Sequence, residues 1–295
     1  IDNCAPERKI FEYRDSVIIR SVGTLLQESY MGDLIQINDA MPKSLNCQEL
    51  ICAVDIAYKN SGDTRLLDAA RKYQGEFLPC DAGWKIAKDL AAVKATPFVL
   101  QSCLVKDGPD GDRGGVALMR PSEDMLVNLK ATTHGNSHGH YDKLTLGYFD
   151  NGNEILCDYG SARFQNVEAK YKGHYTPEHR SFAMQTVAHN TYVIDGQSHF
   201  GGDYDLSSSV WPEMSFHSFG DGLEYVSAVV EGAYPGTKMR RSVICDSRFW
   251  TEGHPERHPL VIDLISMDGC GVASTLYLPF WYDGHLLSIN CPYAK

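Results

Sequence analysis

Side chains that could do chemistry gather in residues 134–190, which hold six of the chain's eleven histidines. His138 and His140 flank one glycine, and on an extended strand both imidazoles would point to the same face, because side chains alternate with a period of two. Downstream, Asp158 and His189 supply a carboxylate and a third imidazole. Zinc accepts such a mixed set of nitrogen and oxygen ligands in a tetrahedral site. The stretch therefore predicts a metal site made by His140, Asp158 and His189.

Other interpretations of the same residues stay open. Asp158 could instead be a turn residue ahead of Gly160. Three protein ligands leave a fourth position for catalysis, whereas a water or a neighbouring side chain there would make the ion purely structural. Four other histidines are expected to be hydrogen-bonded structural residues: His134, His174, His179 and His199.

Arg163 and Tyr175 lie in a segment rich in glycine and tyrosine that is too irregular to be a core strand. Such loops carry function more often than packing. A guanidinium matches a carboxylate, and a tyrosine can give or take a proton when a neighbouring cation lowers its pKa. A surface salt bridge for Arg163 and a packed aromatic ring for Tyr175 remain equal alternatives on chemistry alone.

Composition restricts the classes of protein and partner. The 295 residues carry a net charge of −11, which disfavours nonspecific nucleic-acid binding. An anionic ligand therefore needs a local basic cleft, which four residues could line: Arg163, Lys170, Lys172 and Arg180. The sequence lacks a run of eighteen apolar residues, so we expect no membrane partner. It does not begin with the charged and then apolar pattern of a signal peptide.

Cysteine usage argues against two kinds of framework. The nine cysteines are odd in number and include no CxxC pair, which argues against a disulfide framework and against a thiolate zinc ribbon. Most of them are expected to be buried small residues.

The first third of the chain has a helical pattern. Apolar residues at a spacing of three to four predict a helix of about twenty residues within 8–30. Ser44 or Asn46 could cap a helix that ends at Ser61-Gly62, and Asp63 could cap the next helix of a hairpin. GWKIAKDLAAV predicts a last, weak helix. Everything up to about residue 105 is therefore expected to be α.

Beyond residue 115 the period changes to two. The Gly- and Asp-rich run 106–115 predicts a linker, so we divide the chain into a helical segment, 1–110, and a β domain, 111–295. Short strands recur in VALMR, DMLVNLKA, NTYVIDG, RRSVICD, LVIDLISMDG and STLYLPFWYDG. The fold class expected is α+β, with a large antiparallel β-sandwich following the helices.

An Asn151-Gly152 hairpin loop fixes a register around the predicted metal ligands. It pairs residue 150 with residue 153 and would place Asp158 opposite Thr145, on the odd-numbered face. His140 is even-numbered. A shared ion therefore requires a break in the strand, which residues 141–143 could supply.

These motifs together resemble a known family. The run NSHGHYDKLTLGYFDNGNEILCDYGSARF, followed by YKGHYTPEHRSFAMQTVAHNTYVIDG, resembles the heparinase II/III-like β domain, and most closely the oligoalginate lyases of polysaccharide lyase family 17. LIQINDA at 34–40 resembles a segment of their helical toroid. The likeness extends from Asp33 to LYLPFWYDGH. It implies the C-terminal part of an α/α toroid followed by the β domain.

The resemblance also implies roles for single residues. His140, Asp158 and His189 match the family's zinc ligands, whose role there is structural. Arg163 matches the arginine that grips the uronate carboxylate, and Tyr175 matches a catalytic tyrosine.

Two further residues complete the predicted site. His138 matches the first histidine of the family's HxH pair, beside the substrate, and is predicted to be catalytic with Tyr175; Asn136 is predicted to bind substrate. Family members carry an Asn-His pair and a second tyrosine before the NDA segment. No Asn-His pair precedes Ile35 here, so we expect an N-terminally incomplete chain.

The implied activity is a polysaccharide lyase that cleaves 4-linked uronic acids, as in alginate oligosaccharides, by β-elimination. A glycosaminoglycan lyase and a non-catalytic uronate-binding fragment are the alternatives. A cupin-type oxygenase is disfavoured because Leu144 or Thr145 stands where its glutamate is expected. The resemblance further implies a periplasmic or secreted protein with an acidic saccharide as partner, and it allows a homodimer.

Overall fold

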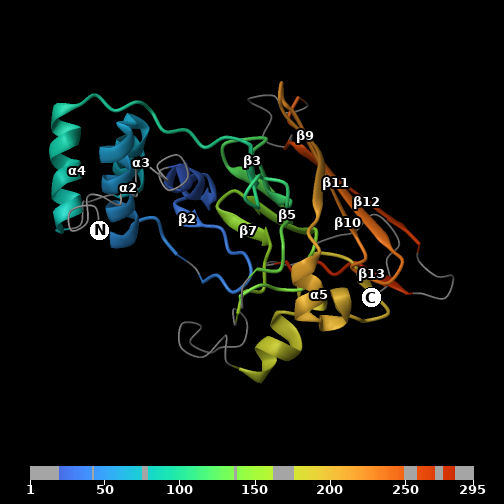
Figure 1. Ribbon diagram of the computed structural model, residues 1–295. Coiled ribbons are helices and arrows are strands. Elements are labelled where there is room, and N and C mark those ends of the chain that lie inside the picture. Colours follow the sequence, from blue (N-terminus) through green and yellow to red (C-terminus); the bar gives the residue numbers. More distant parts are fainter. Residues whose placement is uncertain are drawn as a thin grey trace. The chain divides into compact units, whose positions relative to one another are not determined.

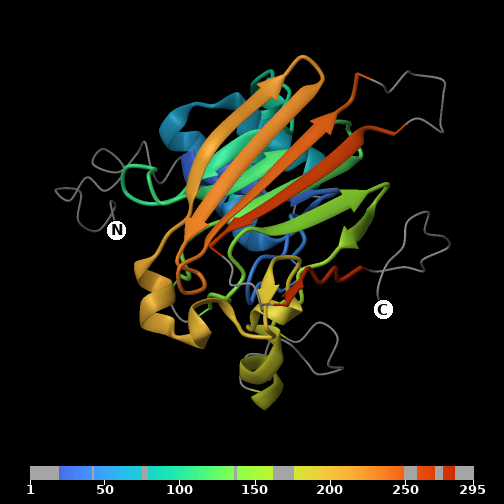
Figure 2. The same ribbon diagram turned by 90° about the vertical axis from the view of Figure 1, so that its right-hand side faces the viewer.

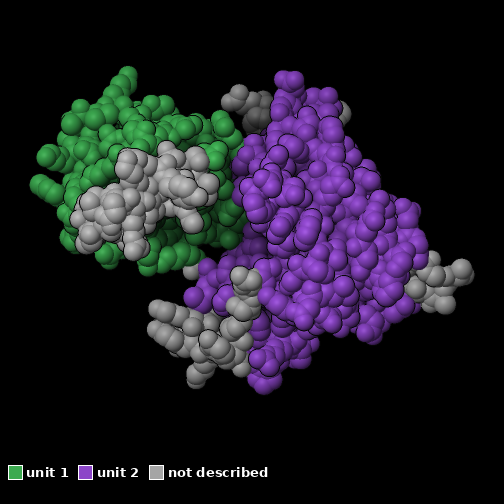
Figure 3. Space-filling model, in the orientation of Figure 1, with its two compact units in different colours: residues 1–35, 42–101 green, residues 36–41, 102–295 purple. Residues whose placement is uncertain are grey.

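The computed structural model describes residues 20–41, 43–74, 79–135, 138–161, 176–248, 258–269 and 275–282. The chain folds into two compact units, coloured separately in Figure 3. Unit 1 comprises residues 1–35 and 42–101, and unit 2 comprises residues 36–41 and 102–295. In the described residues no helix is both long and apolar enough to cross a membrane.

Unit 1 is helical. Residues 20–27 form a helical stretch, and a short pairing of β1 (Ser29–Tyr30) with β2 (Asp33–Leu34) follows it. Three helices come next: α2 (Gln48–Ser61), α3 (Thr64–Tyr73) and α4 (Asp81–Ala92). Their apolar faces bury one core, which includes Ile51, Leu67 and Ile86.

The predicted helix ends in unit 1 are partly confirmed. Gly62 ends α2 in the left-handed conformation, with φ of 70°, and the Asp63 carboxylate accepts the Arg65 amide at 3.0 Å. The residue before α2 is Cys47, so the prediction of Ser44 or Asn46 as its cap is wrong. The predicted first helix cannot reach residue 30, because β1 begins at Ser29.

Unit 2 consists mainly of antiparallel sheets (Figures 1 and 2). The five-stranded sheet has the order β3-β4-β5-β6-β7, and the four-stranded sheet has the order β12-β11-β10-β9. The first sheet contains β3 (Cys103–Lys106), β4 (Gly115–Met119), β5 (Met125–Ala131), β6 (Thr145–Asp150) and β7 (Asn153–Leu156). The second contains β9 (Glu213–Gly220), β10 (Leu223–Glu231), β11 (Lys238–Asp246) and β12 (Leu260–Asp268).

The two large sheets pack around one core. Val127 and Leu129 of β5 and Val226 and Ala228 of β10 are fully buried in the same hydrophobic cluster. Their spacing of two places them on the inner face of each sheet. The α+β class with antiparallel sheets is therefore confirmed.

Several elements differ from the expectation. Strands β3, β9 and β10 were not predicted, and residues 107–114 connect β3 to β4. NTYVIDG and STLYLPFWYDG contribute two short strands, β8 (Val193–Ile194) and β13 (Leu276–Tyr277), which pair with each other. The division at residue 110 stays a prediction. Of the six cysteines in the described residues, all free thiols, two are buried, so the expectation that most are buried is wrong for this set.

Candidate metal site and its histidine cluster

The loop before β6 presents His138 and His140. Neither lies in a strand, so the predicted HxH strand is wrong. Gly139 explains the bend, because a Cβ at this position would lie 1.3 Å from the His134 carbonyl oxygen. Only glycine, which has no Cβ, allows the backbone to approach His134 this closely. His140 is thereby buried, while the His138 side chain is 67% exposed.

The predicted break ahead of β6 is confirmed. A turn with Leu144 at φ 60° precedes Thr145. The hairpin pairs Asp150 with Asn153 as predicted, but the register shifts between Tyr148 and Phe149, and β7 ends at Leu156. The predicted pairing of Asp158 with Thr145 is therefore wrong, and Asp158 lies in the loop after β7.

The three predicted metal ligands do come together. One ligand atom from each of His140, Asp158 and His189 lies within 4.8 Å of the others. Both histidines are buried, and their ring centroids are 5.0 Å apart. Within the described part of the chain, His140 Nδ1 and both ring nitrogens of His189 have no hydrogen-bond partner. Buried polar atoms normally have partners, so these nitrogens are candidate ligand atoms.

The position of Asp158 is compatible with both roles that the sequence left open. Its Oδ1 accepts the Gly160 amide at 2.8 Å, which is the turn contact. Its Oδ2 lies 3.7 Å from His189 Nδ1. Two ligands of a tetrahedral zinc ion, each 2.0–2.1 Å from the metal, are about 3.3 Å apart. The 3.7 Å between Asp158 Oδ2 and His189 Nδ1 is therefore close to the distance between two ligands of one ion, and it is too long for a hydrogen bond.

Charge and burial favour the forms of Asp158 and His140 that bind metals. Burial would raise the pKa of Asp158, but the neighbouring His189 and His140 lower it below its usual value. Burial also lowers the pKa of His140. A carboxylate and a neutral imidazole are the ligand forms that zinc requires. The residues present fit a zinc ion.

Asn190 fixes the loop that carries His189. Its Nδ2 donates to the carbonyl oxygens of Leu146 and Cys157, both at 3.0 Å, and its Oδ1 accepts the Trp281 amide at 2.6 Å. The Trp281 ring packs edge-on against Tyr159 and Phe182. The polar and aromatic contacts together connect the segments on which Asp158 and His189 lie.

Arg241 of β11 supports the same loop from inside the sandwich. Its side chain is fully buried, and it donates to the carbonyl oxygens of Leu144 and Asn190 and to both oxygens of Asp263. Removing one partner of a buried ion pair leaves the other charge uncompensated.

We expect Arg241→Ala to lower the free energy of unfolding by about 3–5 kcal/mol. Lys238→Ala is the matched control, because the Lys238 and Glu231 side chains on the same sheet are 46% and 68% exposed. Exposed pairs contribute roughly 0–1 kcal/mol. Equal urea midpoints for the two variants would contradict the supporting role of Arg241.

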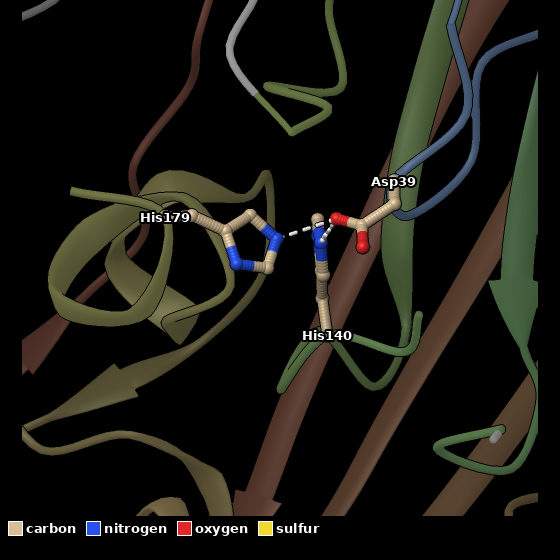
Figure 4. Close-up of side chains that lie close together, drawn as sticks. All are labelled: Asp39, His140 and His179. Carbon is tan, nitrogen blue, oxygen red and sulfur yellow. Dashed lines mark hydrogen bonds and ion pairs between the residues drawn. The ribbon is translucent and has the colours of Figure 1, made fainter. Parts of the chain in front are cut away.

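Asp39, His140 and His179 form a second cluster that the sequence analysis missed (Figure 4). Asp39 Oδ1 lies 2.8 Å from His140 Nε2 and 2.6 Å from His179 Nε2, and Asp39 Oδ2 lies 3.1 Å from His138 Nδ1. Burial would raise the pKa of Asp39, but the hydrogen bonds and charges of His140 and His179 lower it far below its usual value. Asp39 is therefore a carboxylate shared by three imidazoles.

The signal for Asp39 was its place in the NDA segment, although nothing in the sequence joins that segment to the histidines. His179 begins η3 (His179–Ala183), a π-helix, and such irregular turns are frequent at functional sites. His134 and His199 are buried and hydrogen-bonded, as expected: His134 contacts the Ser207 hydroxyl at 3.0 Å, and His199 contacts the Tyr192 carbonyl at 3.0 Å.

Other predicted residues lie outside the described part of the chain. These are Asn136, Arg163, Lys170, Lys172, His174 and Tyr175. Arg180, from the proposed basic cleft, is described and is exposed on η3. The roles of these residues stay predictions.

Comparison with known proteins identifies the family. Residues 104–269, more than half of the chain, match the family described as heparinase II/III-like, C-terminal. The chain belongs to this family. Two curated relatives agree: an alginate lyase of Stenotrophomonas maltophilia (strain K279a), 41% identical over 98% of this chain, and an exo-oligoalginate lyase of Saccharophagus degradans (strain 2-40), 40% identical over 98%. The resemblance inferred from the motifs is confirmed.

The chain spans less than two fifths of these relatives, 38% and 39% of their lengths. Among solved structures, a heparinase III gene product matches 95% of this chain and 36% of its own, with a TM-score of 0.64 and 16% identity. A heparan sulfate lyase from Pedobacter heparinus matches 76% of this chain and 29% of its own, with a TM-score of 0.52 and 15% identity. At these identities the structural matches show a shared fold.

Proposed function

We propose that this heparinase II/III-like chain is part of a polysaccharide lyase that cleaves 4-linked uronic acid chains, in particular alginate oligosaccharides, by β-elimination. The observation that carries the proposal is the 41% identity to an alginate lyase over 98% of the chain. The cluster of His140, Asp158 and His189 supports it, because the residues implied by the resemblance as ligands are brought together although 49 positions separate the first from the last.

Each reacting group has a proposed role in the elimination. The C5 proton of a uronate is weakly acidic, so the adjacent carboxylate must be neutralised while negative charge develops, and Arg163 supplies this charge. Tyr175 transfers a proton as the base at C5 or as the acid at the leaving O4, and a second tyrosine or histidine makes the other of these two transfers. His138, exposed at the loop before β6, and Asn136 contact the substrate beside this centre.

The ion proposed at His140, Asp158 and His189 is zinc, and its role is structural. When bound, it would cross-link the loop before β6, the loop after β7 and the loop after η4 (Thr186–Ala188). These loops carry or flank the proposed substrate contacts. The helices of unit 1 are proposed as the last part of an α/α toroid, and the periplasm or the exterior as the place of action.

An assay of unsaturated product tests this function. We expect the protein to release unsaturated products, detected by their ultraviolet absorbance, from alginate oligosaccharides and not from heparan sulfate. Product from heparan sulfate alone would instead establish a glycosaminoglycan lyase. Calorimetric binding of alginate oligosaccharides without product would establish a uronate-binding fragment.

We expect Arg163→Ala to lower kcat/KM on alginate oligosaccharides by about 10²–10³-fold, because one fixed donor to a developing oxyanion contributes this much. Arg113→Ala is the control, since Arg113 is an exposed arginine of the loop between β3 and β4 and is not part of the proposed basic cleft. Zinc content and melting temperature should stay unchanged in both. Wild-type turnover by Arg163→Ala would refute the assignment.

A further inference from the structure

The contacts of Asp39 have the geometry of hydrogen bonds. Its Oδ1 is 2.8 and 2.6 Å from the Nε2 atoms of His140 and His179, shorter than the separation of about 3.3 Å between two ligands of one tetrahedral zinc ion. His140 belongs to two groups of potential metal ligands, one with Asp158 and one with Asp39, and the distances within the two groups differ. The group with Asp158 has ligand spacing, whereas the group with Asp39 is held by hydrogen bonds.

An ionised carboxylate accepts hydrogen bonds and donates none. Each ring nitrogen that Asp39 contacts must therefore carry a hydrogen. Neutral His140 and His179 then have the Nε2–H tautomer, and neutral His138 has the Nδ1–H tautomer. One carboxylate thus determines where three imidazoles hold their protons.

The consequence for His140 is specific. With hydrogen on Nε2, its Nδ1 keeps a lone pair, and this is the atom that is buried without a hydrogen-bond partner among the described residues. The His140 ring also lies 5.0 Å from the His189 ring. Metal-binding histidines commonly donate their second ring N–H to a carboxylate, which orients the ring and raises its basicity.

Asp39 is itself held in place. Its side chain is 6% exposed, and the preceding Asn38, at φ 59°, accepts a hydrogen bond from the Lys130 ammonium group. Lys130 is buried on β5 and also pairs with Asp142, two residues after His140. The sheet therefore fixes both the segment of Asp39 and the loop of His140.

We propose that Asp39 is a positioning residue, whose carboxylate sets the tautomers of His138, His140 and His179 and thereby presents His140 Nδ1 to the metal site and His138 Nε2 to the substrate side. The inference about the metal and the substrate rests on the proposed function. The tautomers themselves are a property of the zinc-free protein.

Two substitutions at Asp39 separate its effects. Asp39→Ala removes every acceptor. Asp39→Asn keeps one oxygen, which we expect in place of Oδ1 because that position serves two histidines. The amide NH₂ then faces His138 Nδ1 and can donate to it when His138 moves its hydrogen to Nε2. Asp205→Asn, an exposed aspartate of α5 (Tyr204–Ser209), is the control.

Nitrogen-15 NMR of the histidine rings in zinc-free protein at pH 8 reports the tautomers, and chelator competition reports zinc affinity. In wild type and Asp205→Asn we expect Nε2–H at His140 and Nδ1–H at His138. In Asp39→Asn, His138 should change to Nε2–H while His140 keeps its tautomer. In Asp39→Ala, zinc affinity should fall about 10–100-fold.

The outcomes decide the role of Asp39. Unchanged tautomers and zinc affinity in Asp39→Ala would overturn it. If that variant does not fold, retention of Nδ1–H at His138 in Asp39→Asn would overturn it instead. A wild-type protein that binds no zinc would refute the metal site of the proposed function, and the tautomers in the zinc-free protein would still decide whether Asp39 sets them.

Discussion

Replacing His189 by alanine is expected to reduce bound zinc from one equivalent per chain to a trace and to lower the melting temperature with it. His189 is fully buried, and in the described structure neither ring nitrogen has a hydrogen-bond partner. An ion that binds the folded chain and not the unfolded one stabilises the fold, by about 4.1 kcal/mol at a free concentration of one thousand times its Kd. Metal analysis of dialysed protein and thermal denaturation give the two readouts.

The loss of stability caused by the cavity in place of the imidazole must be distinguished from the loss caused by the missing ion. Melting with and without a chelator does this: wild type should lose stability when zinc is removed, and His189→Ala should not respond. His217→Ala, at an exposed histidine of β9, should behave as wild type. A full equivalent of zinc retained by His189→Ala would exclude His189 as a ligand.

The sequence predicted that the three candidate metal ligands meet, but it did not predict most of the local structure that brings them together. His140, Asp158 and His189 meet as expected, but all three lie in loops outside the strands. Period-two reasoning could not show this, because the bend at Gly139 depends on how closely the chain approaches His134, a contact made by folding. The bulge between Tyr148 and Phe149 likewise leaves no local signal in the sequence.

Strands β9 and β10 had a local sequence signal that predicts them, whereas Asp39 did not. The Asp221-Gly222 pair between β9 and β10 is a common hairpin signal and would have predicted both strands. Asp39 had no comparable local signal, since 99 positions separate it from His138. Its role depends on the buried Lys130 that holds the neighbouring Asn38, and a long-range contact of this kind appears only in the folded chain.

Replacing Tyr175 by phenylalanine is expected to lower kcat on alginate oligosaccharides by about 10²–10⁴-fold, which is the usual contribution of one general acid or base. Phenylalanine keeps the ring and removes the hydroxyl, so KM, zinc content and melting temperature should change little. Tyr277→Phe is the matched control, because Tyr277 of β13 is an exposed tyrosine, with 53% of its surface accessible.

The pH profile gives Tyr175→Phe a second readout. If the Tyr175 hydroxyl transfers the proton, the variant's residual kcat should lose one limb of the wild-type profile, because the group that titrates there is gone. A fall in kcat with both limbs retained would show that the hydroxyl positions the substrate and that another group moves the proton. Wild-type kcat in Tyr175→Phe would remove Tyr175 from the mechanism and leave its proton transfer to another residue, with His138 the first to test.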